Sequence, residues 1–419
     1  MNKDKVLVIT VGGSPQPIVK SLKEHDPAYI YFIPSSLTAN EIPAIIESVY
    51  AKGCNAVKKI FTIVDYNDLK ECYKICHEAI EDIYSLGLNT KEIIVDLTGG
   101  TKIMSGALLL AIADLGLTIS YVGGEQRTKD GKGVPINGTE RIICSYHPYD
   151  MLAKASKERF CLCFNGYRFQ SAAVIAEEIS LRGSSSLRYI FGALKQISLG
   201  YFDWDHFRFD RALHAIDKGL FELHRLSSEY HDDIKKLTGF IQEVTQNKEY
   251  LTNLKTDIYS TELVRELVAN SCRRAEEGKY DDAVARLYRA LEMLAQSQFY
   301  DLYRQTTSKF PFEKLHSVLR ARLKNGRDAS GNIDLGCFMA FAQLAHENNE
   351  YGKLFLENRD QIRALMNQRN TSILAHGTIP LDKGKYENLY NIFKDIFEIN
   401  GRHYEFARIE ETDLITIGV

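Results

Sequence analysis

Short apolar runs that alternate with helical stretches occupy the first third of this chain of 419 residues. The runs are rich in Val, Ile, Tyr and Phe and have the length of strands, while apolar residues between them recur at helical spacing. Nearly continuous apolar strands are typical of a parallel sheet that is covered by helices on both faces. The strand-like runs are residues 6–11, 29–33, 59–64, 92–96 and 117–122, and the helical stretches are 17–25, 39–51, 67–86 and 101–115.

This alternation predicts a doubly wound, Rossmann-like α/β domain, because parallel strands require right-handed crossover connections. A further segment, residues 140–145, follows a polar loop and predicts a hairpin strand that closes one edge of the sheet.

The pattern changes near residue 149, since only Pro311 and Pro380 of the nine prolines lie beyond residue 148. From there apolar residues recur every three or four positions, which predicts helices only. A chain of this length has room for two or three domains. The expected division is an α/β domain at 1–148, an all-α connector at 149–258 and a second all-α domain at 259–419; in the last, helices are expected over residues 280–303, 311–324, 335–346, 359–375 and 385–400.

Composition excludes several classes of protein. The formal net charge is −3 at pH 7, so bulk electrostatic attraction to nucleic acid is not expected. The sequence has no apolar run long enough for a membrane helix and no signal peptide. We therefore expect a cytoplasmic protein with no membrane contact, whose eight cysteines are reduced thiols.

Two loops at predicted strand ends form a candidate phosphate or nucleotide site. Ligands of open α/β sheets bind beyond the carboxyl ends of the strands, glycines let backbone amides approach a ligand, and a helix N-terminus favours an anion. Hydroxyl groups and one lysine add polar contacts. The candidate residues are Gly12, Gly13, Ser14 and Gln16 in the first loop, Thr98, Gly99, Gly100, Thr101 and Lys102 in the second, and Ser35 and Ser36 at a third strand end.

Other interpretations of these loops stay open. Gly99 and Gly100 could serve only a tight strand-to-helix turn, Asp96 could orient that turn, and Ser35 and Ser36 could cap the helix that follows them. Neither loop matches the dinucleotide-binding or P-loop motif. The cysteines and Asp/Glu/His residues show no convincing metal-ligand spacing, and we expect no metal site.

Both loops resemble the CARF domain, the CRISPR-associated Rossmann-fold sensor, and the similarity covers about the first 145 residues. The segments that carry it are residues 13–16 and residues 96–104, of which the second is the more specific. The resemblance implies that these loops hold a cyclic oligoadenylate second messenger across a dimer.

Near the C-terminus, Arg369, Asn370 and His376 form a candidate catalytic set. If the helix expected over 359–375 is regular, Arg369 and His376 share one face, and Gly377 with Pro380 ends the helix beside His376. Histidine exchanges protons near neutral pH and arginine stabilises a phosphate in the transition state, which are the requirements of metal-independent RNA cleavage. The alternative is a surface arginine with a histidine that caps the helix C-terminus.

The segment 369–377 resembles the R-N-x-x-x-x-A-H-G form of the HEPN nuclease motif. The whole chain is therefore similar to the CARF–HEPN ancillary ribonucleases of type III CRISPR systems, the Csm-six/Csx-one class. The resemblance implies a homodimer that is activated by cyclic oligoadenylate and cleaves single-stranded RNA in antiviral defence, with two Arg–Asn–His sets in one groove. Attack by the 2′-hydroxyl would leave 2′,3′-cyclic phosphate ends and would need no cofactor.

Two other functions remain open at this stage. The chain could be a CARF ligand sensor without catalysis, whose helical half binds a partner or nucleic acid. The first domain could also cleave its bound messenger slowly through neighbours of Ser14, Thr98 or Lys102.

Overall fold

Strand β1 (Val6–Val11) is fully buried and lies inside a six-stranded sheet of order β3-β2-β1-β4-β5-β6. Neighbouring strands are parallel except β6, which pairs antiparallel with β5 as the sequence predicts. The strand order reverses between β1 and β4, which makes their carboxyl ends the topological switch point. The other strands are β2 (Tyr29–Pro34), β3 (Val57–Ile60), β4 (Ile93–Asp96), β5 (Thr118–Gly124) and β6 (Glu140–Tyr146).

Each face of this sheet is covered by two helices, which confirms the Rossmann-like prediction. Val6 and Val8 belong to one core cluster with α3 (Leu69–Tyr84) and α4 (Lys102–Ile112). Leu7 and Ile9 belong to the opposite cluster with α1 (Pro15–His25) and α2 (Ile42–Val49). Alternate residues of one strand therefore supply the two cores.

Edge strand β3 differs from the prediction, because it ends at Ile60 rather than continuing to residue 64. Its side chains are mostly exposed, and two of them are Lys58 and Lys59. Charged, short strands protect the open edge of a sheet from further pairing. Beyond β3, Ile63 makes only an isolated bridge with Ser35.

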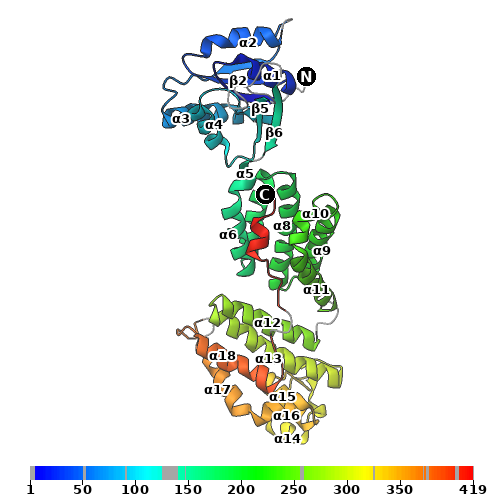
Figure 1. The fold of residues 1–419 in the computed structure, drawn as a ribbon. Coiled ribbons are helices and arrows are strands. Elements are labelled where there is room, and N and C mark those ends of the chain that lie inside the picture. The colour runs from blue at the N-terminus through cyan, green and yellow to red at the C-terminus, as the bar shows by residue number, and fades with distance from the viewer. Residues whose placement is uncertain are drawn as a thin grey trace.

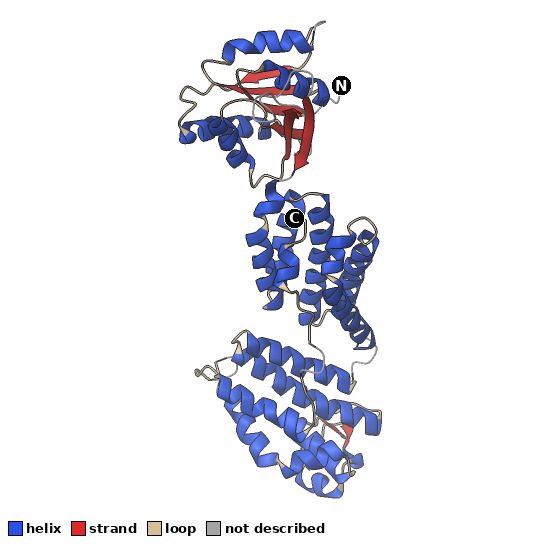
Figure 2. Ribbon diagram, in the orientation of Figure 1, coloured by secondary structure: helices blue, strands red, loops and turns tan. Residues whose placement is uncertain are grey.

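The computed structural model places the sheet domain, a middle helical domain and a last helical domain one after another along the molecule (Figure 1). Strands are almost confined to the first of them (Figure 2). The structure describes residues 5–50, 53–89, 92–124, 140–146, 148–254, 259–323, 326–370, 372–373, 377–401 and 405–418.

Middle-domain helices surround an aromatic core in which Tyr201 and Trp204 are fully buried with their rings stacked 5.9 Å apart. The helices are α5 (Pro148–Leu152), α6 (Lys154–Asn165), α7 (Phe169–Arg182), α8 (Ser185–Asp205), α9 (Phe209–Leu226), α10 (His231–Lys236) and α11 (Thr238–Leu254).

The last domain has a separate core around α13. Its elements are α12 (Thr261–Glu276), α13 (Tyr280–Tyr303), β7 (Phe310–Pro311), α14 (Ser317–Arg322), β8 (Asn332–Ile333), α15 (Cys337–His346), α16 (Glu350–Glu357), α17 (Arg359–Asn370) and α18 (Lys383–Asn391), followed by a π-helical turn at Ile392–Ile396.

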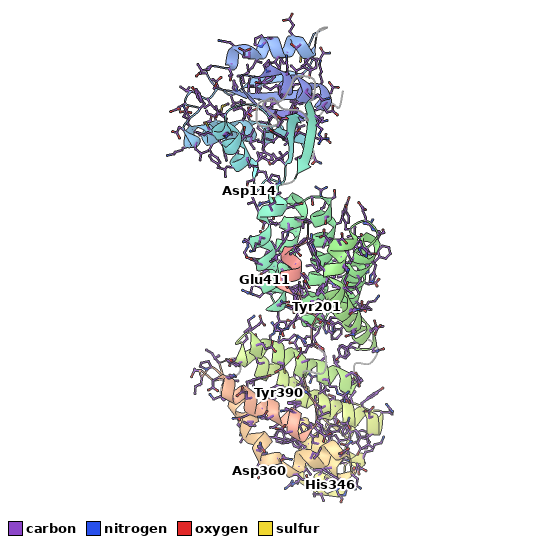
Figure 3. The ribbon with its side chains drawn as sticks, viewed as in Figure 1. Asp114, Tyr201, His346, Asp360, Tyr390 and Glu411 are labelled. Atoms are coloured by element: carbon purple, nitrogen blue, oxygen red, sulfur yellow. The ribbon has the colours of Figure 1, made fainter. Side chains whose placement is uncertain are left out.

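The C-terminal segment 405–418 returns to the middle domain (Figure 1). Phe406 and Ile417 are buried in the same cluster as the middle helices, and α19 (Glu411–Ile415) packs against α6. In Figure 3 Glu411 accordingly lies in the middle domain, as Tyr201 does. The range 259–419 expected for the last domain is therefore divided between two cores, because the apolar side chains of this segment are buried by helices that precede residue 255.

A buried ion network joins the middle and last domains. Asp205 at the end of α8 accepts hydrogen bonds from Arg273 Nε at 2.9 Å and from Arg274 Nη2, both on α12. Arg273 Nη2 also donates to Glu266 Oε1 at 2.6 Å, and its guanidinium lies 3.9 Å from the ring centre of Phe406. Arg273 thus contacts α8, α12 and the returning segment at once.

Removal of Arg273 would leave the buried carboxylate of Glu266 without its cationic partner and would leave Asp205 with Arg274 alone. Arg273→Ala should lower the free energy of unfolding by about 3–5 kcal/mol, measured by chemical denaturation. Arg265→Ala, on the same helix, removes an exposed pair with Glu262 and should cost less than about 1 kcal/mol. Equal effects of the two substitutions would contradict the role assigned to the network.

Candidate functional site

The carboxyl ends of β1 and β4 bring the two predicted glycine-rich loops side by side. Ile9 is paired with Asp96 in the sheet, so the loops that follow start from adjacent positions. α1 begins one residue after Ser14 and α4 begins one residue after Thr101. The N-termini of two helices therefore start at the same edge of the sheet, as expected for a switch-point site.

Three of the glycines serve contact between the loops themselves. A Cβ atom on Gly99 would lie 1.9 Å from the carbonyl oxygen of Thr10, and one on Gly12 would lie 2.7 Å from the amide nitrogen of Gly100. Gly100 also has a φ of +78°, which disfavours other residues. Of the four glycines in the predicted set, only Gly13 would place a Cβ atom in open space. Gly12, Gly99 and Gly100 thus allow the two loops to pack closely against each other.

Several predicted hydroxyls are already used inside the fold. Thr98 Oγ1 accepts the N–H of Val122 at 2.8 Å, and Thr101 is the N-cap of α4, where it accepts the N–H of Met104 at 3.2 Å. Ser35 is buried, and its hydroxyl lies 3.1 Å from that of Thr38. The hydrogen bonds of these side chains therefore stabilise the loops themselves.

The exposed members of the predicted set are Gly13, Ser14, Gln16, Ser36 and Lys102. Ser14 occupies the N-cap position of α1, yet its side chain makes no capping hydrogen bond. Lys102 is at the first position of α4 and has no ion pair with another described residue. These polar groups are the ones that a ligand at this edge could contact.

Asp96 orients the second loop through a hydrogen bond to the loop backbone. Its carboxylate is fully buried and accepts the hydroxyl of Ser21 at 2.6 Å and the N–H of Thr98 at 2.8 Å. His25 lies nearby with Nε2 2.9 Å from the hydroxyl of Ser120. Burial lowers the pKa of His25, and the charge of Lys5 lowers it further, despite the opposing effect of Asp96.

Two residues of this edge were missed from the sequence. Thr10 is buried, and its hydroxyl donates to Gly99 O at 2.6 Å, while Ser105 Oγ donates to the same carbonyl at 2.9 Å. A threonine inside the apolar run 6–11, directly before the glycines, was the available signal for Thr10. Ser105 lies inside a helix and carried no such signal.

The candidate catalytic segment differs from its prediction in one respect. Helix α17 ends at Asn370, five residues earlier than expected, so the argument that Arg369 and His376 share a helical face is wrong. Ser372 instead forms a bridge with Ile379, the N–H of Gly377 donates to Ser372 O at 3.0 Å, and that of Ile373 donates to Ile379 O at 3.2 Å. Ser, Thr and β-branched residues at 371–373 favour leaving the helix.

The side chains of Arg369 and Asn370 and the whole of His376 lie outside the described residues. Their catalytic assignment therefore stays a prediction. Among the residues that are described, no group of three or more His, Cys, Asp and Glu side chains is placed to hold a metal ion. The same residues include no helix long and apolar enough to cross a bilayer.

Two family models match the helical part of the chain. One, described as the Csm6 HEPN domain, matches residues 253–400, and the other, described as the Csm6 6H domain, matches residues 152–251. A search of curated protein sequences found no match.

Solved structures extend the similarity to the sheet domain. Csm6 of Enterococcus italicus, bound to cyclic hexa-2′-fluoro-hexa-dAMP, aligns over 99% of this chain and 99% of its own, with a TM-score of 0.60 and 14% identity. Because the identity is 14%, this similarity establishes the fold alone. Can2 of Sulfobacillus thermosulfidooxidans with cyclic tetra-adenylate aligns over 54% of this chain and 69% of its own at 13% identity. The TM-score of that alignment is 0.25.

The packing of the two loops leads to a test with a matched pair of glycines. Gly99→Ala should lower the free energy of unfolding of the sheet domain by more than about 2 kcal/mol, because the new Cβ meets backbone that cannot move alone. Gly13→Ala, with nothing near its Cβ, should stay within about 1 kcal/mol of the parent. Thermal and denaturant unfolding measure both, and a stable Gly99→Ala variant would contradict the loop contact.

Proposed function

This chain is a CARF–HEPN protein of the Csm6-like class, and from that premise we propose that it is an endoribonuclease switched on by a cyclic oligoadenylate. The observation that carries the proposal is the HEPN match over 253–400, which contains the segment 369–377. A HEPN domain implies ribonuclease activity in general. The substrate proposed is single-stranded RNA, and the setting is type III CRISPR antiviral defence.

Catalysis is assigned to Arg369, Asn370 and His376. The 2′-hydroxyl of the RNA attacks the adjacent phosphorus, the bond to the 5′-oxygen breaks, and a 2′,3′-cyclic phosphate and a 5′-hydroxyl result. The 2′-hydroxyl loses a proton and the departing 5′-oxygen gains one, and His376 takes part in this proton transfer. Arg369 stabilises the charge that grows on the phosphorane, and Asn370 places the phosphate. These steps use protein groups alone, so the proposal includes no catalytic metal.

The messenger site is assigned to the switch-point edge of the sheet. Lys102 stands at the N-terminal end of α4, where a positive side chain is unfavourable for the helix itself and an anion is favoured. Ser14, Gln16 and Ser36 add exposed polar groups. A phosphate of the messenger at this edge would pair with Lys102 and the helix N-terminus.

The proposed assembly is a homodimer. A cyclic messenger would lie across two copies of this edge, and two Arg–Asn–His sets would meet in one groove. The messenger can shift the nuclease only by binding more tightly to the active arrangement of the dimer than to the inactive one.

His376→Ala and Arg369→Ala should each abolish messenger-stimulated cleavage of a fluorescent RNA reporter, because each removes a group that acts on the reacting phosphate. Messenger binding and dimerisation should be retained. The controls are His231→Ala and Arg304→Ala, two exposed positions outside the proposed sites. Parental cleavage by both catalytic variants would place the active site elsewhere.

Lys102→Ala should raise the messenger concentration for half-maximal activation about tenfold, equivalent to about 1.4 kcal/mol of binding free energy. The maximal rate should be unchanged, since the catalytic groups are untouched. Cyclic tetra- and hexa-adenylate titrations measure both quantities, with the exposed Lys74→Ala on α3 as the control. A parental midpoint would remove Lys102 from the messenger site. Lys102 is tested alone because Thr101 also caps α4.

A further inference from the structure

The first turn of α13 contacts the end of the loop that follows α17. The N–H of Leu381 donates a hydrogen bond to Asp281 Oδ2 at 3.1 Å, across one hundred positions of sequence. Leu381 itself is buried in the core of the last domain, which α13, α17 and α18 share. This contact ties the loop to the helix around which the last domain is built.

The second oxygen of the same carboxylate is unusual. Asp281 Oδ1 is buried and accepts no hydrogen bond from any described residue. A buried carboxylate oxygen without a donor lowers the stability of the folded protein. Its location in the first turn of α13 reduces that cost, because a negative charge is favourable at a helix N-terminus.

The loop is closed at its base as well. The backbone bonds from Gly377 to Ser372 and from Ile373 to Ile379 join its two arms, and Asp281 then holds the outgoing arm two residues beyond Ile379. In sequence, His376 lies inside this closed loop, five residues before Leu381. Asp281 therefore anchors the outgoing arm of the loop in which the sequence places His376.

The geometry points to Asp281 as a positioning residue of the nuclease site: its carboxylate holds the loop that carries His376. The inference rests on the proposed function, since it assumes that His376 takes part in RNA cleavage. Asp281 acts through the loop and not on the RNA. Its loss should therefore lower kcat while the KM for RNA and the messenger midpoint stay near their parental values.

The neighbouring aspartate provides a matched control. Asp282 is on the same turn, but its carboxylate lies 3.4 Å from Arg286 Nη1 on the same helix. A general effect of removing negative charge from the first turn of α13 would appear equally in Asp281→Ala and Asp282→Ala. An effect through the loop would appear only in the first.

The test compares full-length Asp281→Ala, Asp281→Asn and Asp282→Ala with the parent and with His376→Ala, using saturating messenger. Asp281→Ala should lower kcat between about 10- and 100-fold, the range expected when a catalytic group is misplaced by about 1 Å. Asp281→Asn keeps an oxygen that can accept the N–H of Leu381, and should return kcat to within about threefold of the parent. Asp282→Ala should match the parent.

Parental kcat in Asp281→Ala, or an equal loss in Asp282→Ala or Asp281→Asn, would overturn the inference. If Asp281→Ala does not fold, as judged by thermal unfolding, Asp281→Ser replaces it, because its shorter side chain moves the oxygen away from Leu381. The His376→Ala variant distinguishes failure of the positioning role from failure of the proposed function. If that variant is inactive and Asp281→Ala is fully active, only the positioning role fails, whereas an active His376→Ala removes the proposed function itself.

Discussion

The buried guanidinium of Arg273 is the interaction on which the arrangement of the two helical domains depends. It joins Asp205 at the end of α8, Glu266 on its own helix and the ring of Phe406 on the returning C-terminal segment. Asn270 adds hydrogen bonds to Asp205. Buried charges are costly unless their partners are in place, so separation of α8 from α12 would be costly. A movement of the middle domain would therefore be transmitted to α12.

The C-terminal segment extends this coupling along the middle domain. It starts at Phe406, beside Arg273, and ends at Gly418, whose N–H lies 3.2 Å from the carboxylate of Asp233 on α10. Lys157, fully buried, donates to the carbonyl oxygen of Ile417 at 2.6 Å, and burial lowers the pKa of its ammonium group. At the sheet domain, Gly116 packs directly against the backbone of Arg182 on α7. Backbone contacts and buried charges thus connect the sheet domain to the last domain.

The fold could be predicted because strand and helix periods are local properties of the sequence, and β1, β2, β4, β5 and β6 were found within two residues of their predicted ends. Contacts between distant segments could not. The return of residues 405–418, the pairing of Arg273 with Asp205 and the packing of Gly99 on Thr10 are set by tertiary structure alone. The end of α17 at Asn370 was missed because local backbone bonds within 372–379 replace the helix. Loop composition placed the candidate residues at strand ends that the structure brings together, but it could not separate Thr98 and Thr101, which are used within the fold, from the exposed Ser14 and Lys102.

The central claim is that a ligand at the first domain controls RNA cleavage in the last. The direct measurement is the cleavage rate of a fluorescent single-stranded RNA by the purified full-length protein, alone and with each cyclic oligoadenylate in turn. The account predicts a low rate without messenger, strong stimulation by at least one ring size, and products that carry 2′,3′-cyclic phosphate ends. A rate that no cyclic oligoadenylate changes, or the complete absence of cleavage with all of them, would contradict it.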